Sequence, residues 1–125
     1  MRFKKPTKRM FEYWIDEDEL GQIIPIKMPY KYVVESFCDM VGASKAYNKD
    51  NWQPSMLWDY WITKCKDKRI MNEESTYLVE KLLWNYYQLG EDRFLEWYKS
   101  AKKHLRESYE NGTLKEKDFT FTGEL

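Results

Sequence analysis

The pattern of apolar and polar side chains has the period of an α-helix over most of the chain. In the clearest stretch, Val33, Phe37 and Val41 recur at four-residue steps and therefore lie on one helical face. Proline suits the first turn of a helix and glycine its C-terminal end, which places boundaries at Pro29 and Gly90. The pattern predicts a small all-α domain of irregularly or orthogonally packed helices. Its four main helices are expected at 29–47, 54–66, 73–89 and 91–110.

The apolar faces of these helices predict one core within a single domain. A chain of 125 residues can bury about two-thirds of its unfolded surface. Residues 1–10 are expected to form a basic arm, and residues 113–125 a tail or a short edge strand. Cys38 and Cys65 fall in predicted helices without zinc-type or redox-type spacing, so we expect two reduced core thiols. The expected core members are Phe37, Val41, Leu57, Trp61, Leu82 and Tyr98.

The N-terminal part of the chain departs from this period. An apolar cluster at 11–15 predicts the last turns of a short helix, which the charged, glycine-containing stretch 16–21 then ends. The acidic run inside that stretch lacks the spacing of a calcium loop and is expected to be solvated. Residues 22–27 are predicted to be extended, as a short β-arm, because Pro25 disfavours the helical conformation at Ile24.

Charge and hydropathy argue against two classes of binding partner, nucleic acids and membranes. Lys and Arg number 21, and so do Asp and Glu, so the chain has no net field to attract nucleic acid. No apolar run approaches the roughly 20 residues of a membrane-spanning helix, and no signal peptide follows the basic start. We therefore expect a cytoplasmic protein that binds neither nucleic acid nor a membrane.

Aromatic side chains are abundant, with 10 Tyr, 6 Trp and 6 Phe. Large rings dominate protein cores and protein interfaces alike, so composition leaves two interpretations open. Most of the rings fit an aromatic-rich core. The alternative is that some of them form a surface that binds a partner, and the candidates are Tyr13, Trp14, Trp52 and Trp58.

Few residues suggest catalytic chemistry. His104 is the single histidine, so the chain by itself assembles neither a histidine metal cluster nor a Cys/His pair. Glu35 and Asp39 lie four residues apart on one helical face, where two carboxylates could hold a metal or act as acid and base. The structural alternative is an ion pair between Lys31 and Glu35, with Asp39 paired elsewhere. We expect no catalytic residue, no metal and no cofactor.

Several short motifs are specific enough to compare with those of a protein family. Between residues 11 and 83, the run Met28-Pro-Tyr-Lys-Tyr32 with Glu35 and the pair Cys38-Asp39 resembles an uncharacterised family of small proteins from phages, prophages and Gram-positive bacteria. Full-length members carry a preceding half whose histidine motifs are similar to those of metal-dependent HD-domain phosphohydrolases. The resemblance implies that Asp39 is a residual metal ligand and Glu35 its neighbour.

The chain lacks the histidines that full-length members of this family carry. Ten residues precede Phe11, Arg9-Met10 replaces a double histidine, and Asn72 stands where a histidine is often found. One helix of carboxylates without imidazoles is not expected to hold a catalytic divalent metal.

These departures favour a non-catalytic phage- or prophage-type protein in the cytoplasm of a bacterial host cell. It would act by binding another protein, such as a host factor, and a homo-oligomer stays open. The alternative is half of a split HD-like phosphohydrolase that needs a second chain to supply its histidines.

Overall fold

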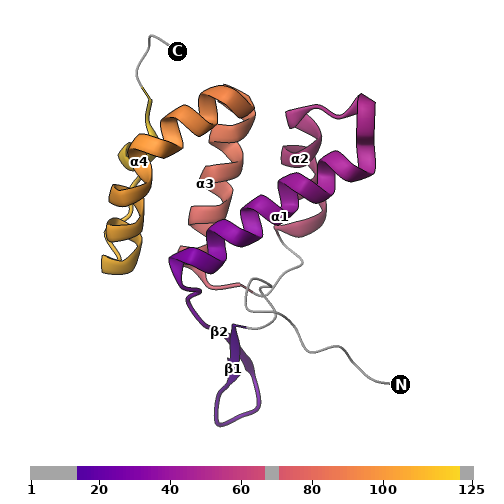
Figure 1. Cartoon of the computed structure of the whole chain (residues 1–125). Coiled ribbons are helices and arrows are strands. Elements are labelled where there is room, and N and C mark those ends of the chain that lie inside the picture. The colour runs from indigo at the N-terminus through magenta and orange to yellow at the C-terminus, as the bar shows by residue number, and fades with distance from the viewer. Residues whose placement is uncertain (1–13, 67–70, 122–125) are drawn as a thin grey trace.

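Four helices form the body of the protein in a computed structural model that describes residues 14–66 and 71–121 (Figure 1). The predicted all-α fold with a short β-arm is confirmed. The second helix ends differently from the prediction, because its last turns have the wider π-helical hydrogen bonding. The helices are α1 (Tyr30–Asn48), α2 (Pro54–Tyr60) with its π-helical continuation η3 (Trp61–Cys65), α3 (Glu73–Leu89) and α4 (Glu91–Asn111). A 3₁₀ turn, η2 (Lys49–Asn51), leads from α1 towards α2.

The boundaries of α3 and α4 follow from single residues. The side chain of Asn72 accepts hydrogen bonds from the backbone N–H groups of Glu74 and Ser75, at 2.9 and 3.2 Å, and so begins α3. Gly90 both ends α3 and begins α4 with a φ of 77°, which a residue with a Cβ rarely adopts. This single-residue connection fixes how α4 leaves α3.

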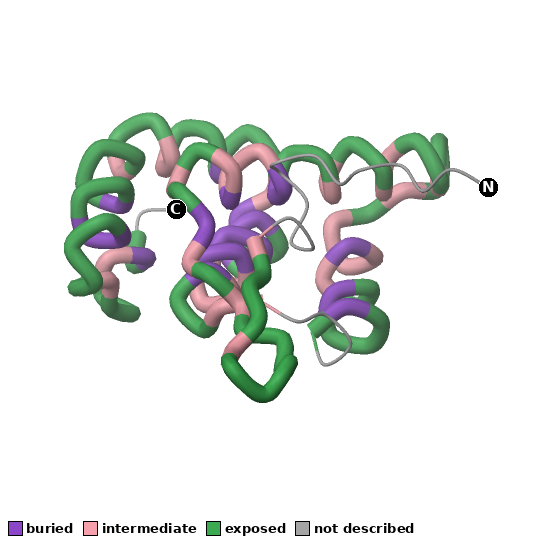
Figure 2. Tube along the Cα trace, turned by 90° about the horizontal axis from the view of Figure 1, so that it is seen from below, coloured by how far each residue is buried: buried purple, intermediate pink, exposed green. Residues whose placement is uncertain are grey.

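The core lies around α3, which packs against the other three helices (Figures 1 and 2). Four of the six predicted core residues are buried in one cluster, namely Phe37, Leu57, Trp61 and Leu82. The other two, Val41 and Tyr98, are half-buried and pack against its edge. Apolar periodicity therefore identified the packed faces correctly.

The two cysteines do not share the predicted environment. Cys65 is buried in the core, whereas Cys38 is exposed. The reason is rotation along the helix: each residue turns the side chain by about 100°, so Cys38 points away from the face of the buried Phe37. Partial desolvation by the surrounding protein, followed by the negative charges of Asp39 and Glu35, raises the pKa of the Cys38 thiol.

An antiparallel hairpin stands where a helical end was predicted. Its strands are β1 (Ile15–Glu17) and β2 (Ile23–Pro25), which confirms the extended arm but makes the helical prediction for Ile15 wrong. Residues 11–13 of that prediction lie outside the described residues. An apolar cluster of five residues is too short for its period to distinguish a helix from a strand.

The C-terminal part is a docked 3₁₀ turn, η4 (Glu116–Phe119), so the prediction of a tail or edge strand is wrong there. Phe119 is buried, and its ring lies 5.9 Å from that of Tyr77. The side-chain amide of Asn85 donates a hydrogen bond of 2.7 Å to the carbonyl of Phe119. These contacts with α3 hold the segment against the helices.

Candidate protein-interaction site

The β1–β2 hairpin projects away from the helical body (Figure 1). Asp16 is paired with Ile24 in its register. Asp18 shapes the turn, since its carboxylate accepts the N–H groups of Leu20 and Gln22 at 2.9 and 2.8 Å. The φ of 77° at Gly21 completes the turn without steric strain. Local hydrogen bonds therefore fold the charged run into a tight hairpin end.

Large aliphatic side chains are exposed along this hairpin. Leu20 at its tip is 84% exposed, and four isoleucines are between 40% and 49% exposed. Scattered exposed apolar residues are ordinary, but these are concentrated on one projecting element, with Ile23 on one face of the hairpin and Ile24 on the other, and such a concentration marks an interaction surface. Figure 2 shows how little of this segment is buried. We call these five residues the aliphatic hairpin surface: Ile15, Leu20, Ile23, Ile24 and Ile26.

The hairpin is also strongly acidic. Residues 16–19 supply four carboxylates, and no lysine or arginine occurs between residues 15 and 26. A surface that combines exposed aliphatic groups with one sign of charge selects partners that offer apolar and oppositely charged groups. The complementary partner is therefore basic as well as apolar.

The base of the hairpin is held rigidly through Met28. This residue is 1% exposed, and its N–H donates a hydrogen bond of 3.0 Å to the hydroxyl of Ser75. Its carbonyl accepts a hydrogen bond of 2.5 Å from the hydroxyl of Tyr109, which also lies 2.8 Å from the Ser75 hydroxyl. Burial raises the pKa of Tyr109 to about 12, so its hydroxyl stays protonated and able to donate at neutral pH.

Lys27 adds a second attachment beside Met28. Its ammonium group donates to the carbonyl of Tyr109 at 2.6 Å and pairs with the carboxylate of Glu74 at 2.8 Å. It also lies 4.5 Å from the centroid of the Tyr109 ring. The hairpin thus leaves the body from a point joined to both α3 and α4.

The aromatic residues suggested as a binding surface occupy separate places. Trp14, at the base of the hairpin, packs on Tyr32 with ring centroids 5.7 Å apart. The indole N–H of Trp52 donates to the hydroxyl of Ser44 at 2.9 Å. Trp58 lies beside α3, and all three tryptophans are half-buried at the edge of the core. Tyr13 lies outside the described residues.

Sequence reasoning missed an exposed aromatic pair on α3. Trp84 and Tyr87 are each 39% exposed and stack with ring centroids 5.6 Å apart. The ring of Trp58 lies 5.0 Å from that of Trp84 and completes the cluster. The spacing of three residues on the outer side of the predicted helix was the available signal.

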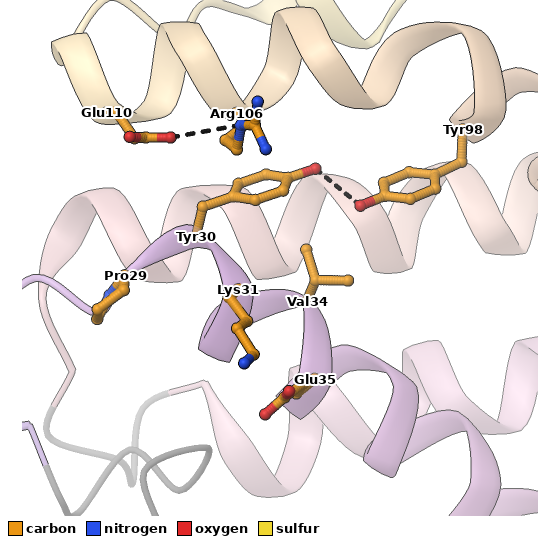
Figure 3. Close-up of a pocket in the computed structure, with 8 residues that line it drawn as sticks. All are labelled: Pro29, Tyr30, Lys31, Val34, Glu35, Tyr98, Arg106 and Glu110. Atoms are coloured by element: carbon orange, nitrogen blue, oxygen red, sulfur yellow. Dashed lines mark hydrogen bonds and ion pairs between the residues drawn. The ribbon is translucent and has the colours of Figure 1, made fainter.

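Glu35 and Asp39, four residues apart on α1, differ in their surroundings. Glu35 lines a surface groove of about 620 Å³ between α1 and α4, whereas exposed Asp39 is not among its lining residues (Figure 3). The structural alternative, an ion pair between Lys31 and Glu35, is not among the ion pairs of the described residues. The ammonium of Lys31 lies instead 5.7 Å from the centroid of the Tyr32 ring.

The groove is centred on two tyrosines. The hydroxyls of Tyr30 and Tyr98 point toward one another at 2.8 Å (Figure 3). Burial, strengthened by this hydrogen bond, raises the pKa of Tyr30 far above its ordinary value. Arg106 and Glu110 on α4 pair at 3.6 Å along the groove. The groove is therefore lined by positively and negatively charged side chains beside the two tyrosine rings.

The described residues include no metal site and no membrane span. No group of three or more His, Cys, Asp and Glu side chains within the described ranges could hold a metal ion. The Nε2 atom of His104 instead lies 2.6 Å from a carboxylate oxygen of Asp118. No helix within those same ranges has the length and apolar character that crossing a membrane requires.

Comparison with known proteins gave no match to a family model, to a curated protein or to a solved structure.

Proposed function

We propose that the protein acts by binding another protein, with the aliphatic hairpin surface as the main contact. The observation that carries this proposal is the exposure of five large aliphatic residues on one short projecting element. A two-stranded hairpin is marginally stable in water without further packing. Covering these side chains with a partner removes apolar surface from water, at about 25 cal/mol per Å².

The rigid base of the hairpin supports the same proposal. Because Lys27 and Met28 are fixed on α3 and α4, the hairpin is presented in one direction before a partner arrives. Preorganisation of this kind lowers the entropic cost of association. The α1–α4 groove begins at Pro29 and Tyr30, directly after this base, so a partner has room to extend its contact there.

Site-specific photo-crosslinking in the cell from which the gene comes tests the proposal. A benzoylphenylalanine placed at position 23 samples the hairpin, and the same group at position 95 is the matched control. Ile23 and Leu95 are both exposed aliphatic residues, at 49% and 55%, but Leu95 lies on α4. We expect an adduct of defined mass from position 23 and none from position 95. Equal labelling at both positions, or none at either, would contradict the proposal.

A further inference from the structure

The hydrogen-bond register of the hairpin distinguishes its two outer edges. The N–H of Ile26 donates to the carbonyl of Trp14 at 2.8 Å, and the N–H of Asp18 donates to the carbonyl of Gln22 at 2.9 Å. In an antiparallel pair, residues alternate between bonding across the ladder and turning their backbone groups outward. Even-numbered residues therefore bond within this hairpin, and odd-numbered residues face the two outer edges.

The outer edge of β2 cannot accept a full strand. Its outward-facing residues are Ile23 and Pro25, and proline has no N–H to donate. Proline at an outward position of an edge strand is a common protection against pairing with other chains. The sequence of β2 therefore prevents a full strand from pairing along this edge.

The outer edge of β1 is open. Ile15 and Glu17 face outward and together offer two N–H and two C=O groups, and the described sheet holds no third strand. The N–H of Glu17 is occupied only by the neighbouring carboxylate of Asp16, at 2.8 Å. Both residues are exposed, so rotation of the Asp16 side chain frees this donor. The edge can thus make a regular ladder with an added strand.

We infer that the outer edge of β1 binds an extended basic segment of the partner as a third strand. The inference rests on the proposed function and specifies how the hairpin recognises its partner. Main-chain hydrogen bonds from Ile15 and Glu17 supply the pairing, as in other cases of strand addition. The carboxylates of Asp16 and Glu17 lie on opposite faces, so each selects a lysine or arginine at one of two consecutive positions. Ile15 selects an aliphatic residue at the position before them.

A heptapeptide with this chemistry is the probe, acetyl-TKRVRKT-amide. Its sequence is symmetric, so a central valine opposite Ile15 places basic residues opposite Asp16 and Glu17 in either strand direction. The matched control is acetyl-TEDVDET-amide. In an NMR titration of the full chain, we expect TKRVRKT to shift the backbone amides of Ile15 and Glu17 and to slow their hydrogen exchange. The amide of Ile23 should not respond.

Two proline variants compare the two outer edges of the hairpin. Ile15→Pro and Ile23→Pro each remove one isoleucine and one outward N–H, so the hairpin ladder and the melting temperature should be the same in both. We expect Ile15→Pro to raise the Kd of the basic peptide at least about three- to tenfold over that of Ile23→Pro, because it loses one hydrogen bond and the isoleucine contact with the peptide valine. Equal Kd values for the two variants, or equal binding of the acidic peptide, would overturn the inference.

Failure of the inference can be distinguished from failure of the proposed function. If the crosslinked partner binds both proline variants equally, the hairpin still binds protein and strand addition is wrong. If position 23 gives no adduct, the proposed function itself is wrong. A dimer in which the amides of Ile15 and Glu17 are protected without peptide would assign the edge to a second copy and overturn the inference.

Discussion

The hydroxyl of Tyr109 donates a hydrogen bond of 2.5 Å to the carbonyl of Met28, which lies 81 residues earlier in the chain. This bond joins the last turns of α4 to the junction between the hairpin and α1. The hydroxyl of Ser75 on α3 lies 2.8 Å from the same Tyr109 hydroxyl, so one buried polar cluster connects two helices, α3 and α4, to the base of the hairpin. The direction of the projecting element is therefore set by the helical core.

Tyr109→Phe should lower the free energy of unfolding by about 1–3 kcal/mol, because the buried carbonyl of Met28 loses its donor. Urea denaturation measures the change. Tyr87→Phe is the matched control, because its ring lies at the surface, and it should leave stability unchanged. Equal effects of the two substitutions would show that the cluster does not hold the hairpin.

Phe37→Ala should cost about 3–5 kcal/mol of stability, the range for removing a buried aromatic ring. The ring of Phe37 lies 5.9 Å from that of Tyr86 and 5.3 Å from that of Phe94, so its loss leaves a cavity. Thermal unfolding of Tyr47→Ala, in which an 88% exposed ring is removed, serves as the control. A melting temperature unaffected by Phe37→Ala would mean that this face of α1 is assigned wrongly.

The docked turn η4 should loosen in acid through Asp118. Burial alone would raise the pKa of this carboxyl, but hydrogen bonds from His104 and from the N–H of Lys115 outweigh burial and lower it. A lowered pKa in the folded state means that the ionised form stabilises the fold. This contribution is present above the ordinary aspartate pKa of about 4 and is lost as the pH falls through the lowered value.

Asp118→Asn should therefore reduce stability at pH 6, and the difference from the unaltered protein should shrink toward pH 2. Free energies of unfolding across this range give the test. Asp59→Asn is the control, because Asp59 is exposed and lies away from the ends of the continuous helix formed by α2 and η3. A difference that stays constant with pH would exclude an ionised Asp118 as the cause.

Elemental analysis of protein purified without chelator tests the alternative of a metal-dependent enzyme. We expect no stoichiometric manganese, iron or zinc, because only Glu35 and Asp39 remain of the ligands that the family resemblance implies. Both the resemblance and a phage or prophage origin stay predictions. Near-stoichiometric metal that disappears in Asp39→Asn would favour a ligand set completed by a second chain.

The helices could be predicted because each depends on local features. Apolar period, prolines at helix starts, the Asn72 cap and Gly90 determine them within a few neighbouring residues. The turn η4 could not be predicted in this way. Its position depends on Asn85 and Tyr77, which are distant in sequence and approach Phe119 only in the folded chain.

The candidate site was only partly visible in the sequence. The isoleucines of 22–27 indicated an extended arm, but nothing local showed that the arm pairs with Ile15–Glu17 or remains uncovered by helices. Tryptophans were candidates for a binding surface because large rings are common at interfaces, but whether a ring is exposed depends on tertiary packing. Helical spacing likewise brought Lys31 within reach of Glu35, but the ammonium lies by the ring of Tyr32 instead.

The most direct test of hairpin binding uses the double variant Ile23→Asp/Ile24→Asp. The crosslinked partner is purified, and its Kd for this variant is measured. Calorimetry would compare it with the unaltered protein and with Leu95→Asp, whose substitution lies at an exposed position of α4. We expect Kd to rise at least about tenfold in the hairpin variant, since replacing one of the few residues that dominate an interface costs more than about 1 kcal/mol. Leu95→Asp should bind like the unaltered protein. A hairpin variant that is folded and keeps its affinity would contradict the account.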